Sequence, residues 1–507
     1  MGALARHARA IARQNEQGLE AMFGRVVHLP ADFGRPRRRR LFLPARVFWL
    51  FLQQVFSSDP TCREVVRTFL GWLALTAKRA SGRTAGYCKA RKRLRQEDLD
   101  QVEAPLTRAI RSDHLIGRLW YGRPVKVVDG SGLSMPDTPK NRALYPPPHT
   151  AAQRQKRSGG RTTRKRRMKR HGASRTKSAR ATRRRCSNPR KAQRPAKAPP
   201  RKRPCAFPVM RVVALFCLGT GLLLELARDS LAVGERRLFR SLWDTLLPDD
   251  VVLADRGFCG YGEFYHLRER GVDAVMRAHP CRTAGRRRVQ RLGRHDEFVL
   301  WLKSKPGPTC PDKALWPSLP DAMLVREITF TVPIPGFRTD VVTVATTLLD
   351  PVAFPTEAFA DLYRQRWQAE LFLRDIKITL GMDILRGQSP EMIHKELTMH
   401  RIAYNLVRLT MLEAARQRNC PVTTLSFKGT LSTLRSWAPL FLFGSRSTRA
   451  ALWRSLIDVI GRDPLPWRPN RIEPRARKRR PKNYQLLNKP RHQFKEILHR
   501  NRYSRTA

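Results

Sequence analysis

The chain has 507 residues, enough for roughly three domains of ordinary size, and 41% of them are hydrophobic, which suffices for a packed core. Its 100 Lys and Arg against 41 Asp and Glu leave a net charge of +59. Solubility needs far less, so this charge predicts a polyanion such as nucleic acid as partner. The longest apolar run, Val212–Leu224, is shorter than the ~20 residues of a membrane-spanning helix, which argues against a membrane protein. Nine scattered cysteines without a CxxC pair predict reduced thiols in a cytoplasmic protein.

The first part of the chain, residues 1–115, has helical patterns throughout. They cover Leu43–Phe56, Cys62–Lys78 and Ser81–Arg95. Basic residues are dense here, as in Arg37–Arg40. We therefore predict an all-helical N-terminal domain that binds DNA through a basic face.

Strand patterns begin after residue 115 and predict an α/β core in two parts, residues 116–150 and 207–260. The expected strands and the helix among them are Pro124–Val128, Val209–Cys217, Leu222–Ala227, the helix Arg236–Leu247, and Val251–Ala254. The glycines of Gly219–Gly221 indicate a hairpin between the second and third strands.

A strongly basic insertion, residues 151–206, separates the two parts of this core. Ala151–Cys205 contains 23 Lys or Arg and no Asp or Glu. Such a composition cannot bury a core, so we predict a disordered arm that binds nucleic acid without sequence preference. An insertion without any function is the alternative.

Residues 261–350 are predicted to form a β-rich insert, with alternating patterns over Val289–Lys303 and Arg326–Leu349. Residues 351–420 carry two helical patterns, the second over Pro390–Arg416. The C-terminal region, residues 421–507, ends in a basic tail that starts near Pro466.

The first of these two helical patterns carries a polar stripe. Tyr363, Arg366, Glu370 and Lys377 fall within an arc of about 60° when each residue turns the helix by ~100°. Apolar residues flank the stripe on both sides, and burying both flanks would make the polar groups costly unless they are paired. One flank comprises Leu362, Ala369, Phe372, Leu373, Ile376 and Leu380, and the other Trp367, Leu371 and Ile378. A metal for the carboxylate and a phosphate for the cations would supply partners, whereas an ordinary ion pair between Arg366 and Glu370 is the simpler interpretation.

Two aspartates are placed to join Glu370. Asp129 and Asp255 each follow a short apolar strand and precede a glycine-bearing turn, where an open α/β sheet places ligand-binding side chains. Three carboxylates repel one another unless a divalent metal intervenes, and oxygen ligands suit Mg²⁺ or Mn²⁺. Two such ions support phosphoryl transfer, for which nucleic acid is the obvious substrate of so basic a chain.

Three motifs resemble those of DDE transposases of the insertion-sequence-four (IS-four) family. They are Asp129–Gly130–Ser131, Asp255–Arg256–Gly257–Phe258, and the stripe spaced as Y-x2-R-x3-E-x6-K. The resemblance implies a ribonuclease H-like catalytic core with Asp129, Asp255 and Glu370 as catalytic metal ligands. It further implies that Tyr363, Arg366 and Lys377 hold phosphates of the transposon end. Double-stranded DNA, both transposon end and target, would be the partner, and a homodimer would form the synaptic complex.

Other interpretations stay open at the level of sequence. A metal-dependent nuclease would share the three carboxylates, and a transposase relic would bind DNA without cutting it. A basic packaging protein would not need the strand-end aspartates. His394 and His400, six residues apart, have the wrong spacing to share a metal on one helix face. Asp375 is predicted to be a surface or ion-pair residue.

Overall fold

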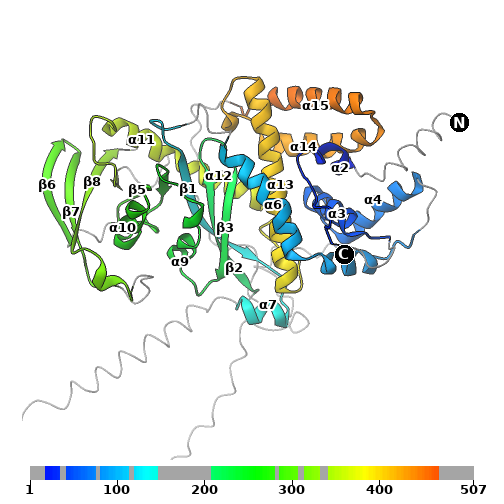
Figure 1. Cartoon of the computed structure of the whole chain (residues 1–507), viewed down its shortest axis with the longest axis horizontal. Coiled ribbons are helices and arrows are strands. Elements are labelled where there is room, and N and C mark those ends of the chain that lie inside the picture. The colour runs from blue at the N-terminus through cyan, green and yellow to red at the C-terminus, as the bar shows by residue number, and fades with distance from the viewer. Residues whose placement is uncertain are drawn as a thin grey trace, which may run out of the picture.

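The computed structural model describes residues 18–34, 41–75, 80–112, 119–146, 207–279, 285–306, 313–331 and 341–466. The basic insertion predicted at Ala151–Cys205, and the tail beyond Pro466, lie outside these residues. The described parts form the α/β molecule that we predicted, with a large sheet beside a group of helices (Figure 1). No helix in these parts is both long enough and apolar enough to cross a membrane.

The N-terminal helices pack against the C-terminal helices. They are α2 (Gly18–Phe23), α3 (Pro44–Phe56), α4 (Cys62–Leu75), α5 (Ala85–Arg93) and α6 (Gln96–Ser112). The C-terminal helices are α13 (Pro390–Gln417), α14 (Phe427–Trp437) and α15 (Arg446–Gly461). Helix α13 contacts α3, α6, α14 and α15, and most of its residues are buried, so it is the common support of both groups. Proline in the first turn favours the starts of both α3 and α13, because its missing N–H has no helical acceptor there.

The sheet has nine strands in the order β3-β2-β1-β4-β5-β9-β8-β7-β6. Their bounds are β1 Val125–Ser134, β2 Val209–Cys217, β3 Leu223–Ser230, β4 Val251–Ala254, β5 Asp273–Arg277, β6 Arg286–Gly293, β7 Asp296–Leu302, β8 Ala322–Thr331 and β9 Val341–Thr346. Strands β1, β4 and β5 are parallel to one another, and the other neighbouring pairs are antiparallel. The chain crosses between β4 and β5 through α10 (Tyr261–Glu269), while α9 (Glu235–Arg240) precedes β4.

Strand β1 is longer than the sequence predicts. The predicted strand stops at Val128, with a glycine turn after Asp129, but β1 continues to Ser134 because β2 pairs with it over that whole length. Gly130 fits this strand since a Cβ there would lie 2.8 Å from the Glu235 side chain on α9. Strand β4 pairs with β1 only as far as Val127, so the two parallel strands part just before Asp129.

The other predicted elements of the core agree with the structure except for one helix and the third strand, since β3 runs from Leu223 to Ser230 and so continues three residues past the predicted end at Ala227. β2 and β4 have the predicted bounds, and the hairpin after β2 turns at Gly221, whose φ of +71° favours glycine. The predicted helix Arg236–Leu247 is shorter: α9 ends at Arg240, and a 3₁₀ turn, Trp243–Thr245, follows.

The helical pattern around Tyr363 is not one straight helix. It consists of α11 (Thr356–Gln365), α12 (Trp367–Arg374) and a π-helical turn, Asp375–Thr379. A π turn holds more residues than an α turn, so the angular position predicted for Lys377 does not apply. Only one apolar flank is buried as predicted, because Trp367 is 36% exposed and Ile378 65% exposed.

Candidate active site

The two aspartates occupy equivalent places on neighbouring parallel strands. The last pair of residues that joins β1 and β4 is Val127 and Leu253, and Asp129 and Asp255 each lie two residues further along. Both therefore follow the point at which the strands part, where an open α/β sheet forms its ligand crevice. Glu370 lies on α12, which packs against β1. The fold thus brings a helix carboxylate towards the two strand carboxylates.

The charged residues around Asp129 shift the pKa of its carboxyl group. Burial raises the pKa of Asp129 to about 6, while the hydrogen bond from the Gly130 N–H and the Arg366 guanidinium lower it. The negative charges of Asp255 and Glu370 raise it further. Both predicted partners of Asp129 therefore lie within electrostatic reach of its carboxyl group, as a shared catalytic site requires.

Arg366 is the cation of this group. Its guanidinium donates a hydrogen bond to Glu370 Oε1 at 3.0 Å and lies 6.0 Å from the centre of the Tyr363 ring. Its side chain is only 17% exposed, compared with 38% for Glu370. Burial by itself would lower the pKa of Arg366, but Tyr363 and the nearby carboxylates raise it on balance. Arg366 is thus held as a cation between Tyr363 and the carboxylates.

Each aspartate is oriented by a backbone N–H of a residue that follows it in the chain. Asp129 Oδ1 accepts from the Gly130 N–H at 2.8 Å, and Asp255 Oδ1 accepts from the Gly257 N–H at 2.7 Å. These bonds use one oxygen of each carboxylate and leave the other without a hydrogen bond from the described residues. The carboxylate oxygens are the donors that Mg²⁺ and Mn²⁺ prefer, so the chemistry of the site fits a divalent cation.

The present arrangement of these carboxylates is nevertheless looser than a formed metal centre. In the part of the chain that the structure describes, no three His, Cys, Asp or Glu side chains stand together as a metal-binding group. Glu370 instead has Arg366 as its partner. Ligation by all three carboxylates would therefore require Glu370 to exchange this partner for the cation.

The remaining two residues of the predicted stripe differ in their surroundings. Tyr363 is half-buried beside Phe330, and burial raises its pKa. Lys377 is only 8% exposed and contacts β1 through Ser131 and Gly132. Arg366 thus contacts both Tyr363 and Glu370, whereas Lys377 contacts β1 instead. Asp375, predicted to be a surface or ion-pair residue, is buried and pairs with Arg408 at 2.6 Å.

Sequence reasoning missed Arg277, the last residue of β5. Because Ala254 pairs with Met276, Arg277 lies level with Asp255 on the next parallel strand. Its charge acts on Tyr363, and its guanidinium has no hydrogen-bond or ion-pair partner within the described residues. The rule that pointed to Asp255, a polar residue where a buried parallel strand ends, would have found Arg277 had β5 been predicted.

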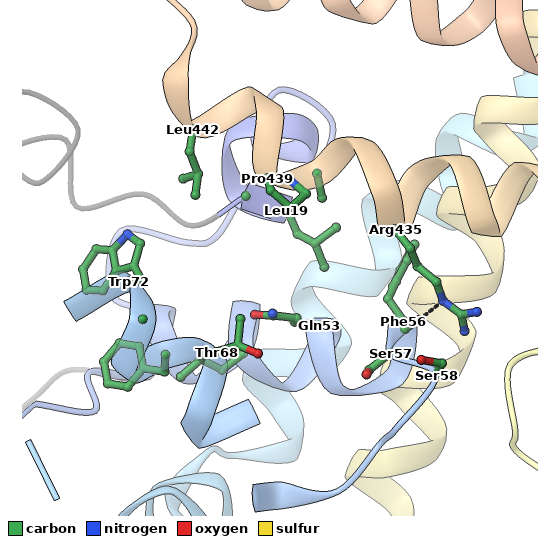
Figure 2. Close-up of a pocket in the computed structure, with 15 residues that line it drawn as sticks. Leu19, Gln53, Phe56, Ser57, Ser58, Thr68, Trp72, Arg435, Pro439 and Leu442 are labelled. Atoms are coloured by element: carbon green, nitrogen blue, oxygen red, sulfur yellow. Dashed lines mark hydrogen bonds between the residues drawn. The ribbon is translucent and has the colours of Figure 1, made fainter. Parts of the chain in front are cut away.

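Two cavities between the described N-terminal and C-terminal helices do not include the three carboxylates. One of about 440 Å³ lies between the N-terminal and C-terminal helices, where its lining includes Leu19, Trp72 and Leu442 (Figure 2). Arg435 crosses one side of it to donate to the backbone carbonyl of Phe56. This lining is mainly apolar and has no acidic residue, so the cavity offers no oxygen cluster for a metal.

Comparison with known families decides the family of the chain. Residues 120–406, more than half of its length, match the family model described as "Transposase DDE domain". The chain belongs to the DDE transposase family. The matched region of this DDE transposase runs from just before β1 into α13, and so includes Asp129, Asp255 and Glu370.

Individual relatives agree with this family. The chain is 27% identical over 284 residues to the transposase InsG for insertion sequence element IS4 of Escherichia coli (strain K12). This match covers 55% of the chain and 62% of InsG. This relative supports the predicted IS-four family, although the chain spans less than two thirds of its length. A shorter match, 34% identical over 71 residues, covers 14% of the chain and 19% of a probable transposase for insertion sequence element IS5377 of Geobacillus stearothermophilus.

Among solved structures, the chain is similar to the piggyBac transposase in a synaptic complex with hairpin DNA. The TM-score is 0.42 at 8% sequence identity, and the match covers 87% of this chain and 84% of the piggyBac chain.

Proposed function

We propose that the chain is a DNA transposase that cuts at the ends of an insertion sequence and joins them to target DNA by metal-dependent phosphoryl transfer. The observation that carries this proposal is the position of Asp129 and Asp255 just beyond the last β1–β4 pair, with Glu370 on the helix packed against β1. A surface ion pair alone would not need two aspartates level with each other on parallel strands.

We infer that β1 to β5 form a ribonuclease H-like core. This inference is supported by the mixed sheet, in which the β1–β2–β3 meander adjoins the parallel strands β4 and β5, with the carboxylates where β1 and β4 part. The antiparallel strands β6 to β9 would then be the β-rich insert, and the helices before β1 the DNA-binding region. The insert shares its sheet with the core through the β5–β9 pair.

The reaction that we propose has two displacement steps. Water attacks the phosphodiester at the element's end, and the bond from phosphorus to the 3′-oxygen breaks, which frees a 3′-hydroxyl and leaves a 5′-phosphate. The freed 3′-hydroxyl loses its proton and attacks a phosphodiester of the target, where the bond from phosphorus to the target's own 3′-oxygen breaks and that oxygen leaves as a new 3′-hydroxyl. Mg²⁺ or Mn²⁺ held by Asp129, Asp255 and Glu370, as two ions in the complete site, would stabilise negative charge on the reacting phosphate.

The cations of the chain would position the DNA for these steps. Arg366 presents a guanidinium suited to the oxygens of a phosphate, and Tyr363 supports it from one side. Arg277, which lies level with Asp255 on the next strand, would contact the same strand of DNA. A phosphate that binds Arg366 would compete with Glu370 for the guanidinium and so free the carboxylate for the cation. Joining two element ends requires two sites, which implies a homodimer in the synaptic complex.

A second candidate function is a transposase relic that binds DNA and does not cut it. The ion pair of Arg366 with Glu370 favours this alternative, because it occupies the carboxylate that the reaction needs. The two candidates share their DNA contacts and differ only in catalysis.

A strand-transfer assay separates these candidates. Purified protein is incubated with an oligonucleotide duplex of an element end, a target plasmid and Mg²⁺, and both nicked ends and joined products are counted. We expect wild type to form both, and Asp129→Asn and Asp255→Asn to form neither while still binding the duplex. Asp361→Asn, an exposed carboxylate on the neighbouring helix α11, is the matched control and should react as wild type does. Wild-type binding without any cleavage would support the relic.

A further inference from the structure

Two cysteines of the N-terminal helices are in contact with each other. Cys62 is the first residue of α4, and Cys88 lies on α5. Their side chains share a hydrogen bond, in which the Cys88 thiol donates to the Cys62 sulfur. Both residues are half-buried, so solvent reaches them, and neither is in a disulfide. The reaction proposed above uses neither of them.

Gln54, which is buried on α3, fixes the two cysteines in this arrangement. Its Nε2 donates to Cys62 Sγ at 3.7 Å. Its Oε1 accepts from the hydroxyl of Tyr87 at 2.9 Å and from Arg91 Nη1 at 2.8 Å. Tyr87 directly precedes Cys88, and Arg91 follows it by about one helical turn. One amide on a third helix therefore holds both the start of α4 and the part of α5 that carries Cys88.

The surroundings of Cys62 favour its thiolate. The hydrogen bond from Cys88 lowers the pKa of Cys62 by more than burial raises it. The charges of Arg91 and Arg386 and the hydrogen bond from Gln54 lower this pKa further. The partial positive charge at the start of a helix acts in the same direction. The hydrogen bond also raises the pKa of Cys88, so a nucleophilic thiolate lies beside a protonated thiol.

We propose that Cys62 and Cys88 form a peroxide-sensitive pair, in which Cys62 attacks the oxidant and Cys88 then closes a disulfide between α4 and α5. The Cys62 thiolate attacks one oxygen of hydrogen peroxide, the O–O bond breaks and hydroxide leaves, which gives a sulfenic acid. Cys88 then loses its proton, its sulfur attacks the Cys62 sulfur, and the hydroxyl group of the sulfenic acid leaves as hydroxide. The two sulfurs together lose two electrons to the peroxide, and the two hydroxides take up the protons of the two thiols to give two water molecules.

The first step prepares the second. The hydrogen bond to the Cys62 thiolate and the negative charge of that thiolate raise the pKa of Cys88, and oxidation of Cys62 removes both effects. Cys88 therefore loses its proton more readily once Cys62 is a sulfenic acid. The sulfurs, already in hydrogen-bond contact, must then approach to the ~2.05 Å of a disulfide.

The disulfide would form where the N-terminal helices meet α13. Lys395 on α13 donates to the backbone carbonyl of Lys92 on α5 at 3.0 Å, and the charge of Glu396 acts on Arg91. Oxidation would remove the negative charge of Cys62 beside Arg91 and restrict the movement of α4 relative to α5. Because neither cysteine takes part in the proposed reaction with DNA, this chemistry can be measured without DNA.

Peptide mapping tests the pairing. The full-length protein is treated with hydrogen peroxide, its remaining thiols are alkylated during denaturation, and trypsin then releases Cys62 in residues 47–63 and Cys88 in residues 84–89. We expect these two peptides to be joined by a disulfide that disappears on reduction. Cys420→Ser, which removes another half-buried cysteine, is the matched control and should form the same disulfide. A Cys62 that stays reduced, or that pairs with a cysteine other than Cys88, would overturn the proposal.

Serine variants assign the two roles. In Cys88→Ser the thiolate is still oxidised but has no partner, so the sulfenic acid of Cys62 should accumulate and be trapped by dimedone. In Cys62→Ser the protonated Cys88 should react with peroxide at least about 10-fold more slowly than Cys62 does in wild type, because the thiolate is the nucleophile. Equal rates for the two cysteines would contradict the assignment of Cys62 as the attacking residue.

The pH dependence of oxidation gives the same information in wild type, without any variant that must fold. A thiol of ordinary pKa, ~8.5, gains about eightfold in thiolate between pH 7 and pH 8. Cys62, largely thiolate already at pH 7, should be oxidised less than about twofold faster at pH 8. The rate is measured from the loss of the alkylated peptide 47–63 at a fixed peroxide concentration. An eightfold increase would show that Cys62 is an ordinary thiol and would refute the proposal, whatever the protein does with DNA.

Discussion

The guanidinium of Arg366 and the carboxylate of Glu370 are partners, 3.0 Å apart and one helical turn from each other. One is the residue proposed to hold phosphate, and the other the residue proposed to hold the cation. Their contact links the two kinds of binding, since a phosphate on Arg366 releases the carboxylate. It also means that the two residues should respond differently to substitution.

Glu370→Gln should abolish cleavage and spare DNA binding. Glutamine retains the shape and can still accept from Arg366, but it lacks the negative charge of a metal ligand. We expect the Mg²⁺-dependent cleavage rate to fall on the order of 10³-fold, a size typical of removing one electrostatic group from a catalytic site. A gel shift and a cleavage assay on the same duplex measure both effects, and efficient cutting by Glu370→Gln would show that Arg366 and Glu370 are only a helix-surface pair.

Arg366→Ala should instead weaken binding to the element end. A lost charge-assisted hydrogen bond costs about 1.5–3 kcal/mol, or roughly 10- to 100-fold in affinity, and the salt slope should decrease by about 0.9. The control is Arg364→Ala, an exposed arginine of the preceding helix that pairs with Asp361. Equal slopes for Arg366→Ala and wild type would rule out a phosphate contact at this position.

The buried pair of Asp375 and Arg408 should be critical for stability. Arg408 pairs with Asp375 at 2.6 Å and lies 4.8 Å from the ring centre of Phe372, so Asp375→Asn leaves a buried cation without its counter-charge. We expect the free energy of unfolding in urea to fall by about 3 kcal/mol. Removing both charges, in Asp375→Leu with Arg408→Met, should recover much of that loss. If the double variant is as unstable as Asp375→Asn, packing rather than charge explains the effect.

Acid should destabilise the protein through His400 on α13. Burial and the charge of Arg386 lower its pKa to about 3, below the ~6.5 of an unfolded histidine. A lowered folded pKa stabilises the protein above pH 6.5, and this contribution is lost as the pH falls towards 3, by at most about 1.4 kcal/mol per pH unit.

The variant His400→Leu should therefore lose less unfolding free energy than wild type between pH 7 and pH 5, by up to about 2 kcal/mol. Urea unfolding at both pH values measures this difference, and His28→Gln, at an exposed position, is the control. Parallel losses in wild type and His400→Leu would exclude a contribution from His400.

Deletion of Ala151–Cys205 should leave the melting temperature nearly unchanged, because the segment has 23 Lys or Arg and little large and apolar to contribute to a core. Nonspecific DNA binding should weaken, and its dependence on salt should become flatter. Thermal melting and titration with unrelated duplex DNA at several salt concentrations test both. A chain that no longer folds after the deletion would show that the segment is part of the structure.

Much of this architecture follows from local sequence. The bounds of β2 and β4 and the long helix α13 were predictable to within about a residue, since hydrophobic periodicity and flanking glycine or proline are local signals. The three motifs pointed to Asp129, Asp255 and Glu370 as candidate metal ligands, because each motif has fixed internal spacing, and this assignment stays a prediction. Composition alone indicated a polyanionic partner, since a charge of +59 needs no fold to be counted.

Only the tertiary structure decided how these pieces meet. β1 runs past Asp129 because β2, from the other side of the basic insertion, pairs along it. Lys377 turns from the predicted stripe to Ser131, 246 residues earlier in the chain, through a π turn that no helical periodicity shows. Arg277 lies beside Asp255 only because β5 joins the sheet next to β4. Contacts between segments so far apart depend on strand order and on the choice of buried hydrogen-bond partners, and neither is written in the spacing of nearby residues.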